Sequence, residues 1–113
     1  MHLLLADDEP IVLDIVGKLL RRAGHTVQTS RDGEEAREAF RFQTFDIVFT
    51  DLSMPKLDGL GLAKWIKAAA PDQQIVLLTG SGNDGVLPPN VDYVLEKPVR
   101  SGPLLDTLRR LAR

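Results

Sequence analysis

The feature that most constrains the fold of this chain is a nearly unbroken apolar run that ends at an aspartate. The run extends from Phe45 to Asp51, and a loop containing Pro55 and Gly59 follows it before a helical pattern begins. A strand that is covered on both faces has such a continuous Val/Ile/Phe composition, which is typical of a parallel sheet between layers of helices. Ligands of these sheets bind outside the carboxyl ends of the strands. We therefore expect a central buried strand, with Asp51 at its functional end.

The composition indicates one small domain. The 113 residues are enough for a single core, so we expect one domain over residues 1–113. The formal net charge is -2 and the Lys and Arg residues form no cluster, so we expect neither a nucleic-acid nor a membrane-surface partner. The absence of cysteine excludes disulfides and cysteine-ligated metals. The chain has no signal-peptide core and no apolar run of membrane-spanning length, and we expect a cytoplasmic location.

Helical and extended patterns alternate along the chain. Apart from the central run, four segments have the pattern of strands: 3–6, 25–29, 74–79 and 91–95. Helical patterns begin near Pro10, Gly33, Gly59 and Ser101. This alternation predicts a three-layer α/β domain with a five-stranded parallel sheet. The connection over residues 80–90 contains three glycines and two prolines, so we predict a loop where the fourth helix of such a fold would lie.

Polar residues that suit phosphate chemistry follow the predicted central strands. They are Asp7, Asp8, Asp51, Thr79 and Lys97. Three carboxylates at one edge raise one another's pKa unless a cation neutralises them. Mg²⁺ is the hard cation that such an oxygen site favours. A carboxylate nucleophile with a metal, an ammonium and a hydroxyl constitutes a phosphoryl-transfer site. Each element alone has a simpler explanation, such as a helix cap for Asp7 and Asp8 or a surface turn for Lys97.

These motifs in this order resemble the receiver domain of two-component response regulators over the whole chain. The resemblance is carried by Asp7-Asp8-Glu9-Pro10, by Asp51 with Met54-Pro55 and Asp58-Gly59, by Thr79-Gly80 and by Glu96-Lys97-Pro98. It implies a flavodoxin-like (CheY-like) fold with strand order 2-1-3-4-5 and a cis peptide bond before Pro98. It also implies a signalling phosphoacceptor, not an enzyme, that assists its own phosphotransfer and dephosphorylation.

The resemblance assigns a role to each residue at the strand ends. Asp51 would accept a phosphoryl group from a phosphohistidine on a histidine kinase or histidine phosphotransfer protein. Asp8, Asp51 and the backbone carbonyl of Ser53 would ligate Mg²⁺ directly, and Asp7 would act largely through water. Thr79 and Lys97 would contact the phosphoryl oxygens. Because the last helix ends with the chain, we expect a stand-alone receiver that signals to a separate effector protein.

Two features depart from the family pattern. The family usually has an aromatic residue three positions before the lysine, where this chain has Val94, and Tyr93 lies one position earlier. Neighbouring side chains of a strand point to opposite faces, so Tyr93 should lie on the other face. With the missing helix, this favours one alternative, a phosphorylation-independent adaptor for protein–protein interaction. A small haloacid-dehalogenase-like phosphatase is a further alternative, but its Asp-x-Asp spacing is not that of Asp7 and Asp8.

Overall fold

The apolar run after Phe45 forms the central strand of a five-stranded parallel sheet. A computed structural model describes residues 1–80 and 86–112 of the chain. Strand β3, Ile47–Asp51, is buried at every position. The strand order is β2-β1-β3-β4-β5, and every neighbouring pair is parallel. The predicted fold class and strand order are therefore confirmed.

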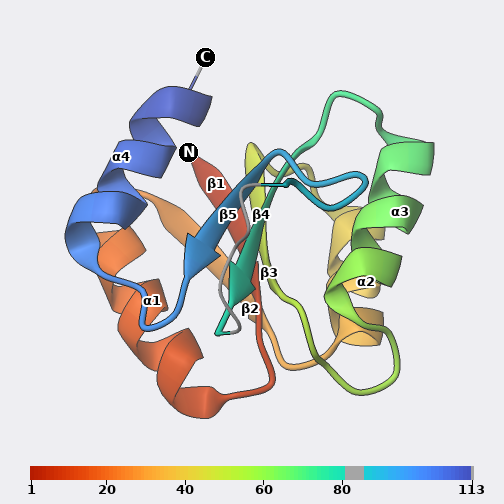
Figure 1. Ribbon diagram of the computed structural model, residues 1–113, viewed down its shortest axis with the longest axis horizontal. Coiled ribbons are helices and arrows are strands. Elements are labelled where there is room, and N and C mark those ends of the chain that lie inside the picture. The colour runs from red at the N-terminus through yellow and green to blue at the C-terminus, as the bar shows by residue number, and fades with distance from the viewer. Residues whose placement is uncertain (81–85, 113) are drawn as a thin grey trace.

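The strands and helices alternate along the described part of the chain, apart from the connection between β4 and β5 (Figure 1). In addition to β3, the strands are β1 His2–Ala6, β2 Thr26–Ser30, β4 Gln74–Thr79 and β5 Tyr93–Glu96. The helices are α1 Pro10–Arg22, α2 Gly33–Phe42, α3 Gly59–Ala69 and α4 Ser101–Leu111. The bounds of β4 are those that the sequence predicts.

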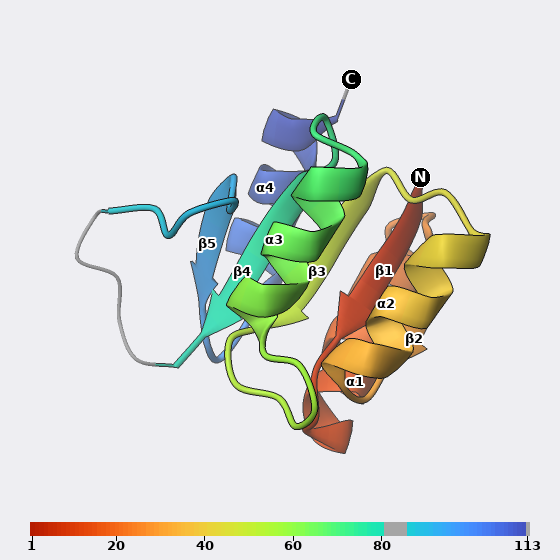
Figure 2. The same cartoon turned by 90° about the vertical axis from the view of Figure 1, so that its right-hand side faces the viewer.

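The helices form two layers, one on each face of the sheet. Helices α1 and α4 cover one face and α2 and α3 cover the other (Figures 1 and 2). Alternate residues of β3 supply the two cores: Ile47 and Phe49 pack on the side of α1 and α4, and Val48 packs on the side of α2 and α3. A strand with apolar side chains on both faces requires helices on both sides, which is why this composition gives a three-layer domain.

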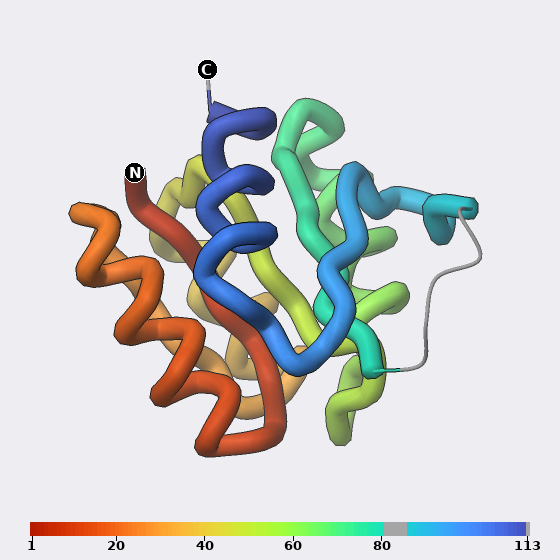
Figure 3. The backbone as a smooth tube through the Cα atoms, turned by 60° about the vertical axis from the view of Figure 1, so that its left-hand side comes forward, coloured from red at the N-terminus to blue at the C-terminus, as the bar shows by residue number. Residues whose placement is uncertain are grey.

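The strand register brings the polar strand ends to one edge of the sheet. Ala6 is paired with Thr50, Asp51 with Leu78, and Thr79 with Glu96. Asp7, Asp51, Thr79 and Lys97 therefore end or follow strands at the same level. We call this the carboxyl edge. Figure 3 shows both chain termini at the opposite edge of the sheet.

Helix α1 differs from its predicted pattern. Its sequence predicts an apolar face made of Ile11, Ile15 and Leu19 together with Val12, Val16 and Leu20, but the side chains of Ile11 and Ile15 are 65% and 49% exposed. Val16 and Leu20 are buried as expected, and Gly17 is buried beside them. The chain contains two apolar stripes on this helix, and only one of them can face the sheet. The periodicity predicts the helix but does not decide which stripe is buried.

The connection between β4 and β5 has no helix in its described residues, which are 80 and 86–92. The central part of the predicted loop, residues 81–85, lies outside the described residues. Strand β5 begins at Tyr93, later than the predicted Val91, because the Asp92 carboxylate accepts a hydrogen bond from the backbone N–H of Ile75 at 2.8 Å. A side chain thus replaces a backbone carbonyl at the start of this pairing.

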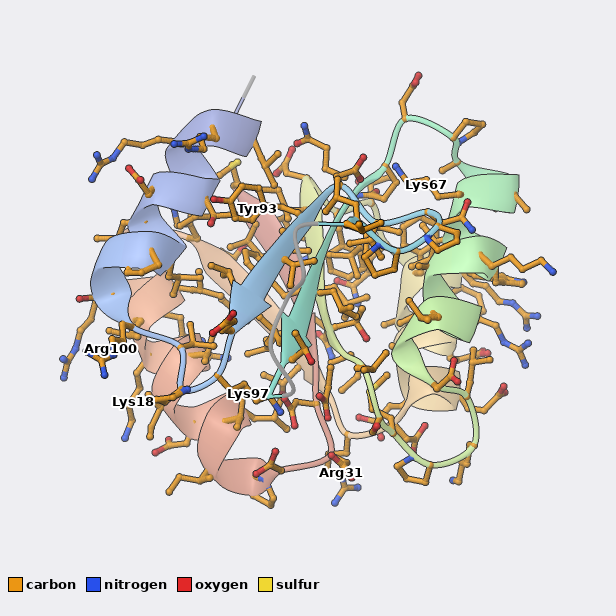
Figure 4. The ribbon with its side chains drawn as sticks, viewed as in Figure 1. Lys18, Arg31, Lys67, Tyr93, Lys97 and Arg100 are labelled. Atoms are coloured by element: carbon orange, nitrogen blue, oxygen red, sulfur yellow. The ribbon has the colours of Figure 1, made fainter. Side chains whose placement is uncertain are left out.

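Tyr93 and Val94 lie on opposite faces of β5, as the sequence predicts. Tyr93 packs against the core on the side of α1 and α4, whereas Val94 packs on the side of α2 and α3. Figure 4 shows Tyr93 directed toward α4. The peptide bond between Lys97 and Pro98 is cis, as the resemblance implies.

Gly59 is a position where the fold tolerates no side chain. A Cβ atom there would lie 2.1 Å from the backbone oxygen of Asp51, whereas a Cβ at Gly102 would have no atom within 4 Å. Gly59 and Gly102 both lie in the first turn of a helix, so they form a matched pair. We expect Gly59→Ala to lower the free energy of unfolding by about 1–3 kcal/mol through overpacking. Gly102→Ala should raise it by about 0.5–1 kcal/mol. Urea unfolding measures both, and equal stability of the two variants would contradict the close packing at Asp51.

Candidate functional site

Backbone hydrogen bonds that continue the sheet fix the residues at the carboxyl edge. The N–H of Asp7 donates to the carbonyl of Ser30 at 3.0 Å, beyond the end of the β1–β2 pairing. The N–H of Lys97 donates to the carbonyl of Thr79 at 2.8 Å. The sheet itself therefore positions the backbone of these site residues, and no flexible loop separates them from it.

Lys97 is the centre of the site. Its Nζ lies 2.9 Å from Asp7 Oδ2, 3.1 Å from Asp51 Oδ1 and 2.9 Å from Glu9 Oε1. The exposed fraction of the side chain is 17% for Lys97, 0% for Asp7, 9% for Asp51 and 55% for Glu9. Figure 4 shows Lys97 at the lower end of β5, where the strands end. One ammonium thus joins carboxylates from two other segments of the chain, and two of the three carboxylates are buried.

An open cavity of about 470 Å³ lies above these groups. Its lining includes Asp8, Glu9, Asp51, Ser53, Thr79 and Lys97. Asp8 and Ser53 are exposed, whereas Thr79 is buried at the end of β4. Asp7 lies beneath the cavity, and its Oδ1 accepts a hydrogen bond from the N–H of Glu9 at 2.9 Å. All the residues that the sequence predicts for the site therefore meet at this edge.

The environment shifts the pKa of the two central groups. Burial raises the pKa of Asp51; Lys97 opposes this shift, while the charge of Asp7 and a hydrogen bond with Asp8 add to it. Burial lowers the pKa of Lys97, but Glu9, Asp7 and Asp51 together raise it above its ordinary value. Lys97 consequently keeps its charge at all physiological pH values. The Asp51 carboxylate is stabilised less than an exposed one would be.

The donor set fits a hard divalent cation. Asp7, Asp8, Glu9 and Asp51 each offer one carboxylate oxygen, and these oxygens lie within 4.8 Å of one another. The buried Oδ2 of Asp7 accepts no hydrogen bond, and its contact with Lys97 is an ion pair only. Oxygen ligands on an open, partly hydrated site are those that Mg²⁺ prefers. One ammonium does not balance four acids, so the charge of the site also favours a cation.

Sequence reasoning missed one member of this site. The sequence explains Glu9 as the acid before Pro10 at the start of a helix, and Glu9 is indeed the N-cap of α1, with Pro10 as the first helical residue. Its side chain, however, reaches Lys97 across the carboxyl edge. The sequence does contain a sign of this role, because Glu9 is the third acid of the run Asp7-Asp8-Glu9. An acid at that position lies near enough to the predicted site to pair with Lys97.

The two histidines of the chain lie away from this site. His2 is hydrogen-bonded to Thr26 and Gln43 at the other edge of the sheet, at 2.8 and 2.9 Å. Its ring stacks on Phe45 with the centroids 4.7 Å apart. The ring of His25 contacts the amino terminus of the chain at 2.9 Å. Both histidines are thus engaged in structural contacts.

Comparisons with known proteins agree with this geometry. A family model of the response regulator receiver domain matches residues 3–109. The chain belongs to this family. Receiver domains are signalling phosphoacceptors of two-component systems that interact with histidine kinases and effectors and bind Mg²⁺ at the acidic pocket. In the described residues of this receiver domain, no helix has both the length and the apolar character needed to cross a membrane.

Relatives of this receiver domain include both long and short proteins. It is 43% identical over 68 residues to the gliding motility regulatory protein of Myxococcus xanthus, a match that covers 60% of the receiver domain but only 9% of that protein. It is 29% identical to the response regulator receiver protein CpdR of Brucella abortus, over 97% of the receiver domain and 95% of CpdR. The response regulator TrrA of Thermotoga maritima, solved in complex with Mg(2+)-BeF, superimposes with a TM-score of 0.90 at 28% identity, over 97% of each chain.

The raised pKa of Asp51 predicts that its charge destabilises the metal-free fold. Below the ordinary pKa of 3.8 the group is protonated in both the folded and the unfolded chain, so this destabilisation is absent. It appears as the pH rises through the raised folded value, and it is complete above that value. With metal ions chelated at pH 7, Asp51→Asn should therefore increase the free energy of unfolding by about 1 kcal/mol, an ordinary size for one substitution. Lys97 keeps two acidic partners in this variant.

Urea unfolding across a pH series measures this effect. The gain of Asp51→Asn over the wild type should shrink as the pH falls toward 3.8. Asp14→Asn is the control, because Asp14 is 60% exposed and forms its ion pair with Lys18 on the same helix. A less stable Asp51→Asn variant at pH 7 would show that the ion pair with Lys97 outweighs the burial of the carboxylate.

Proposed function

We propose that this receiver domain accepts one phosphoryl group on Asp51 and passes the signal to a separate effector protein. The donor is a phosphohistidine of a histidine kinase or of a histidine phosphotransfer protein. The observation that carries the proposal is the position of Asp51. Its carboxylate borders the open cavity, forms an ion pair with Lys97 and lies close to three further acids. Membership of the receiver family supports the same reaction. The domain is a phosphoacceptor that assists its own phosphotransfer and dephosphorylation. We do not propose that it converts a small-molecule substrate as an enzyme does.

The transfer is an in-line displacement at phosphorus. A carboxylate oxygen of Asp51 attacks the phosphorus atom, a new O–P bond forms, and the P–N bond of the phosphohistidine breaks. The departing imidazole nitrogen keeps the electron pair. Lys97 neutralises charge on the phosphoryl oxygens, and the Thr79 hydroxyl donates to one of them. Such reactions depend mainly on positioning and on charge neutralisation. The backbone hydrogen bond between Thr79 and Lys97 favours the reaction because it holds these two residues side by side.

The acids of the site would hold Mg²⁺, which supplies charge neutralisation for the phosphoryl oxygens when it is bound. We assign Asp8, Asp51 and the backbone carbonyl of Ser53 as its ligands, with Asp7 contributing through water. The exposure of Asp8 and Ser53 at the cavity and the buried, hydrogen-bond-free Oδ2 of Asp7 support this assignment.

The downstream partner is proposed on the basis of the relatives. CpdR, of which this receiver domain spans 95%, is itself named a receiver protein. We propose that the output of this receiver domain passes, in the same family's manner, to a separate effector protein that binds it when Asp51 is phosphorylated. We place this exchange in the cytoplasm, as for two-component systems in general.

One observation favours a second candidate, a receiver-like adaptor that binds its partner without phosphorylation. In this receiver domain, position 94 is valine and Tyr93 packs on the opposite face of β5. The aromatic residue that the resemblance implies at position 94 is thus replaced by a smaller side chain. The complete set of acids around Lys97 opposes this candidate, because an adaptor does not need them.

Phosphorylation of Asp51 is tested by intact-mass spectrometry after incubation with acetyl phosphate and Mg²⁺. In this assay the acetyl P–O bond breaks and acetate leaves. We expect the wild type to gain one phosphoryl group, and the gain should be absent in Asp51→Asn and after chelation of the metal. Asp46→Asn, which changes an exposed acid at the opposite edge of the sheet, should still be labelled.

Unlabelled wild-type protein, under conditions that label a control receiver, would contradict the proposal. Binding of the downstream partner separates the two candidates. Equal affinity of that partner for the phosphorylated wild type and for Asp51→Asn would favour the adaptor.

A further inference from the structure

Glu9 is an acid of the site to which neither the sequence nor the family resemblance assigns a role in the chemistry. We propose that Glu9 is a positioning residue that holds Lys97 in the unphosphorylated state and competes with the phosphoryl group for it. This inference rests on the proposed function, because it names a control on the same phosphorylation site. Three observations carry it: the number of partners of Lys97, the exposure of Glu9, and its place in the cavity.

Lys97 already has three anionic neighbours in this structure. Three carboxylates lie within 3.1 Å of Nζ, and the contact with Glu9 is a hydrogen bond of 2.9 Å. A phosphoryl group on Asp51 brings new anionic oxygens into the same space. These oxygens compete with the three carboxylates for the ammonium, which has only three N–H donors.

Glu9 is the partner that can be released with the least loss. Asp7 is fully buried, so removing its counter-charge would leave an uncompensated charge inside the protein. Asp51 carries the phosphoryl group itself. Glu9 is 55% exposed, and water can solvate its carboxylate when the contact with Lys97 breaks.

Glu9 also repels the incoming group. Its side chain lines the cavity of about 470 Å³ that Asp51 borders. A carboxylate there bears the same sign of charge as a phosphoryl oxygen. Glu9 therefore opposes phosphorylation twice, by holding Lys97 and by its own charge, while the same charge favours a divalent cation.

The structural role of Glu9 resides in its backbone and can be separated from its charge. Its N–H donates to Asp7 Oδ1 at 2.9 Å, and its carbonyl accepts from Val12 and Leu13 in the first turn of α1. Its side chain forms no cap hydrogen bond. Glu9→Gln thus removes the charge, keeps the shape and preserves these backbone contacts.

Binding of the phosphoryl mimic beryllofluoride tests the proposal directly. Isothermal titration calorimetry on the full chain with saturating Mg²⁺ gives its affinity, and a separate titration gives that of Mg²⁺ alone. We expect Glu9→Gln to bind beryllofluoride about two- to fivefold more tightly than the wild type, the range of a half-exposed ion pair. Its affinity for Mg²⁺ alone should stay equal to or fall slightly below that of the wild type. Glu9→Ala should show the same pattern.

The control is Glu38→Gln, because Glu38 is an exposed acid of α2 whose ion pair with Arg41 is far from the site. It removes the same charge and an ion pair, and it should leave both affinities unchanged. If Glu9 had only a structural role, its variants would bind both Mg²⁺ and beryllofluoride more weakly than the wild type. Such a role cannot produce tighter binding of beryllofluoride.

Three results would overturn the proposal. Unchanged or weaker beryllofluoride binding in both Glu9 variants would show that Glu9 does not compete for Lys97. A tenfold or larger loss of Mg²⁺ affinity in Glu9→Gln would make Glu9 a metal ligand instead. If the wild type itself does not bind beryllofluoride with Mg²⁺, the proposed function fails, and the role of Glu9 fails with it. The first two results leave phosphorylation of Asp51 intact, so the two failures are distinguishable.

Discussion

The structure depends on the contact of one ammonium with three carboxylates at the carboxyl edge of the sheet. Lys97 and Glu9 are 88 positions apart in the chain, yet their side chains form an ion pair of 2.9 Å. Asp51 comes from a third segment between them. Because two of these acids are buried, the removal of Lys97 would leave charge that water cannot solvate. The same contact thus stabilises the metal-free fold and prepares the site for an anionic ligand.

The parallel topology brings these groups together. In a parallel sheet all strands end at one edge, so residues that come after different strands become neighbours without being near in sequence. The backbone hydrogen bonds from Asp7 to Ser30 and from Lys97 to Thr79 extend this order past the last strand residues. Gly59 adds a further constraint, since its N–H donates to the carbonyl of Leu52 at 2.9 Å and fixes the loop after Asp51. Chemistry and fold therefore depend on the same backbone contacts.

Local pattern and topology were predictable from the sequence, whereas the rotation of elements against one another was not. The apolar run before Asp51 and the segment from Gln74 to Thr79 carry their own signal, because a strand buried on both faces has few polar positions. The direction of the strands alone then places the polar strand ends at one edge. The exposure of Ile11 and Ile15 could not be predicted, because it depends on the rotation of α1 against the sheet. The late start of β5 depends on a tertiary contact as well, since the side chain of Asp92 takes the place of a backbone partner.

Glu9 shows where the limit of such reasoning lies. An acid before Pro10 has a sufficient local explanation as the start of a helix, and α1 does begin there. Its second contact exists only because the turn after β5 carries Lys97 to the end of β1. When a residue has two roles, the sequence indicates the role that local structure explains. At this edge the sheet determines the position of the buried acids, Asp7 and Asp51, whereas the exposed Glu9 is held by one ion pair. The electrostatics of the site can therefore change at Glu9 without a change in the fold. Proteins of this architecture can thus differ in how readily they accept a phosphoryl group through exposed residues at the cavity, such as Glu9, while the buried acids stay the same.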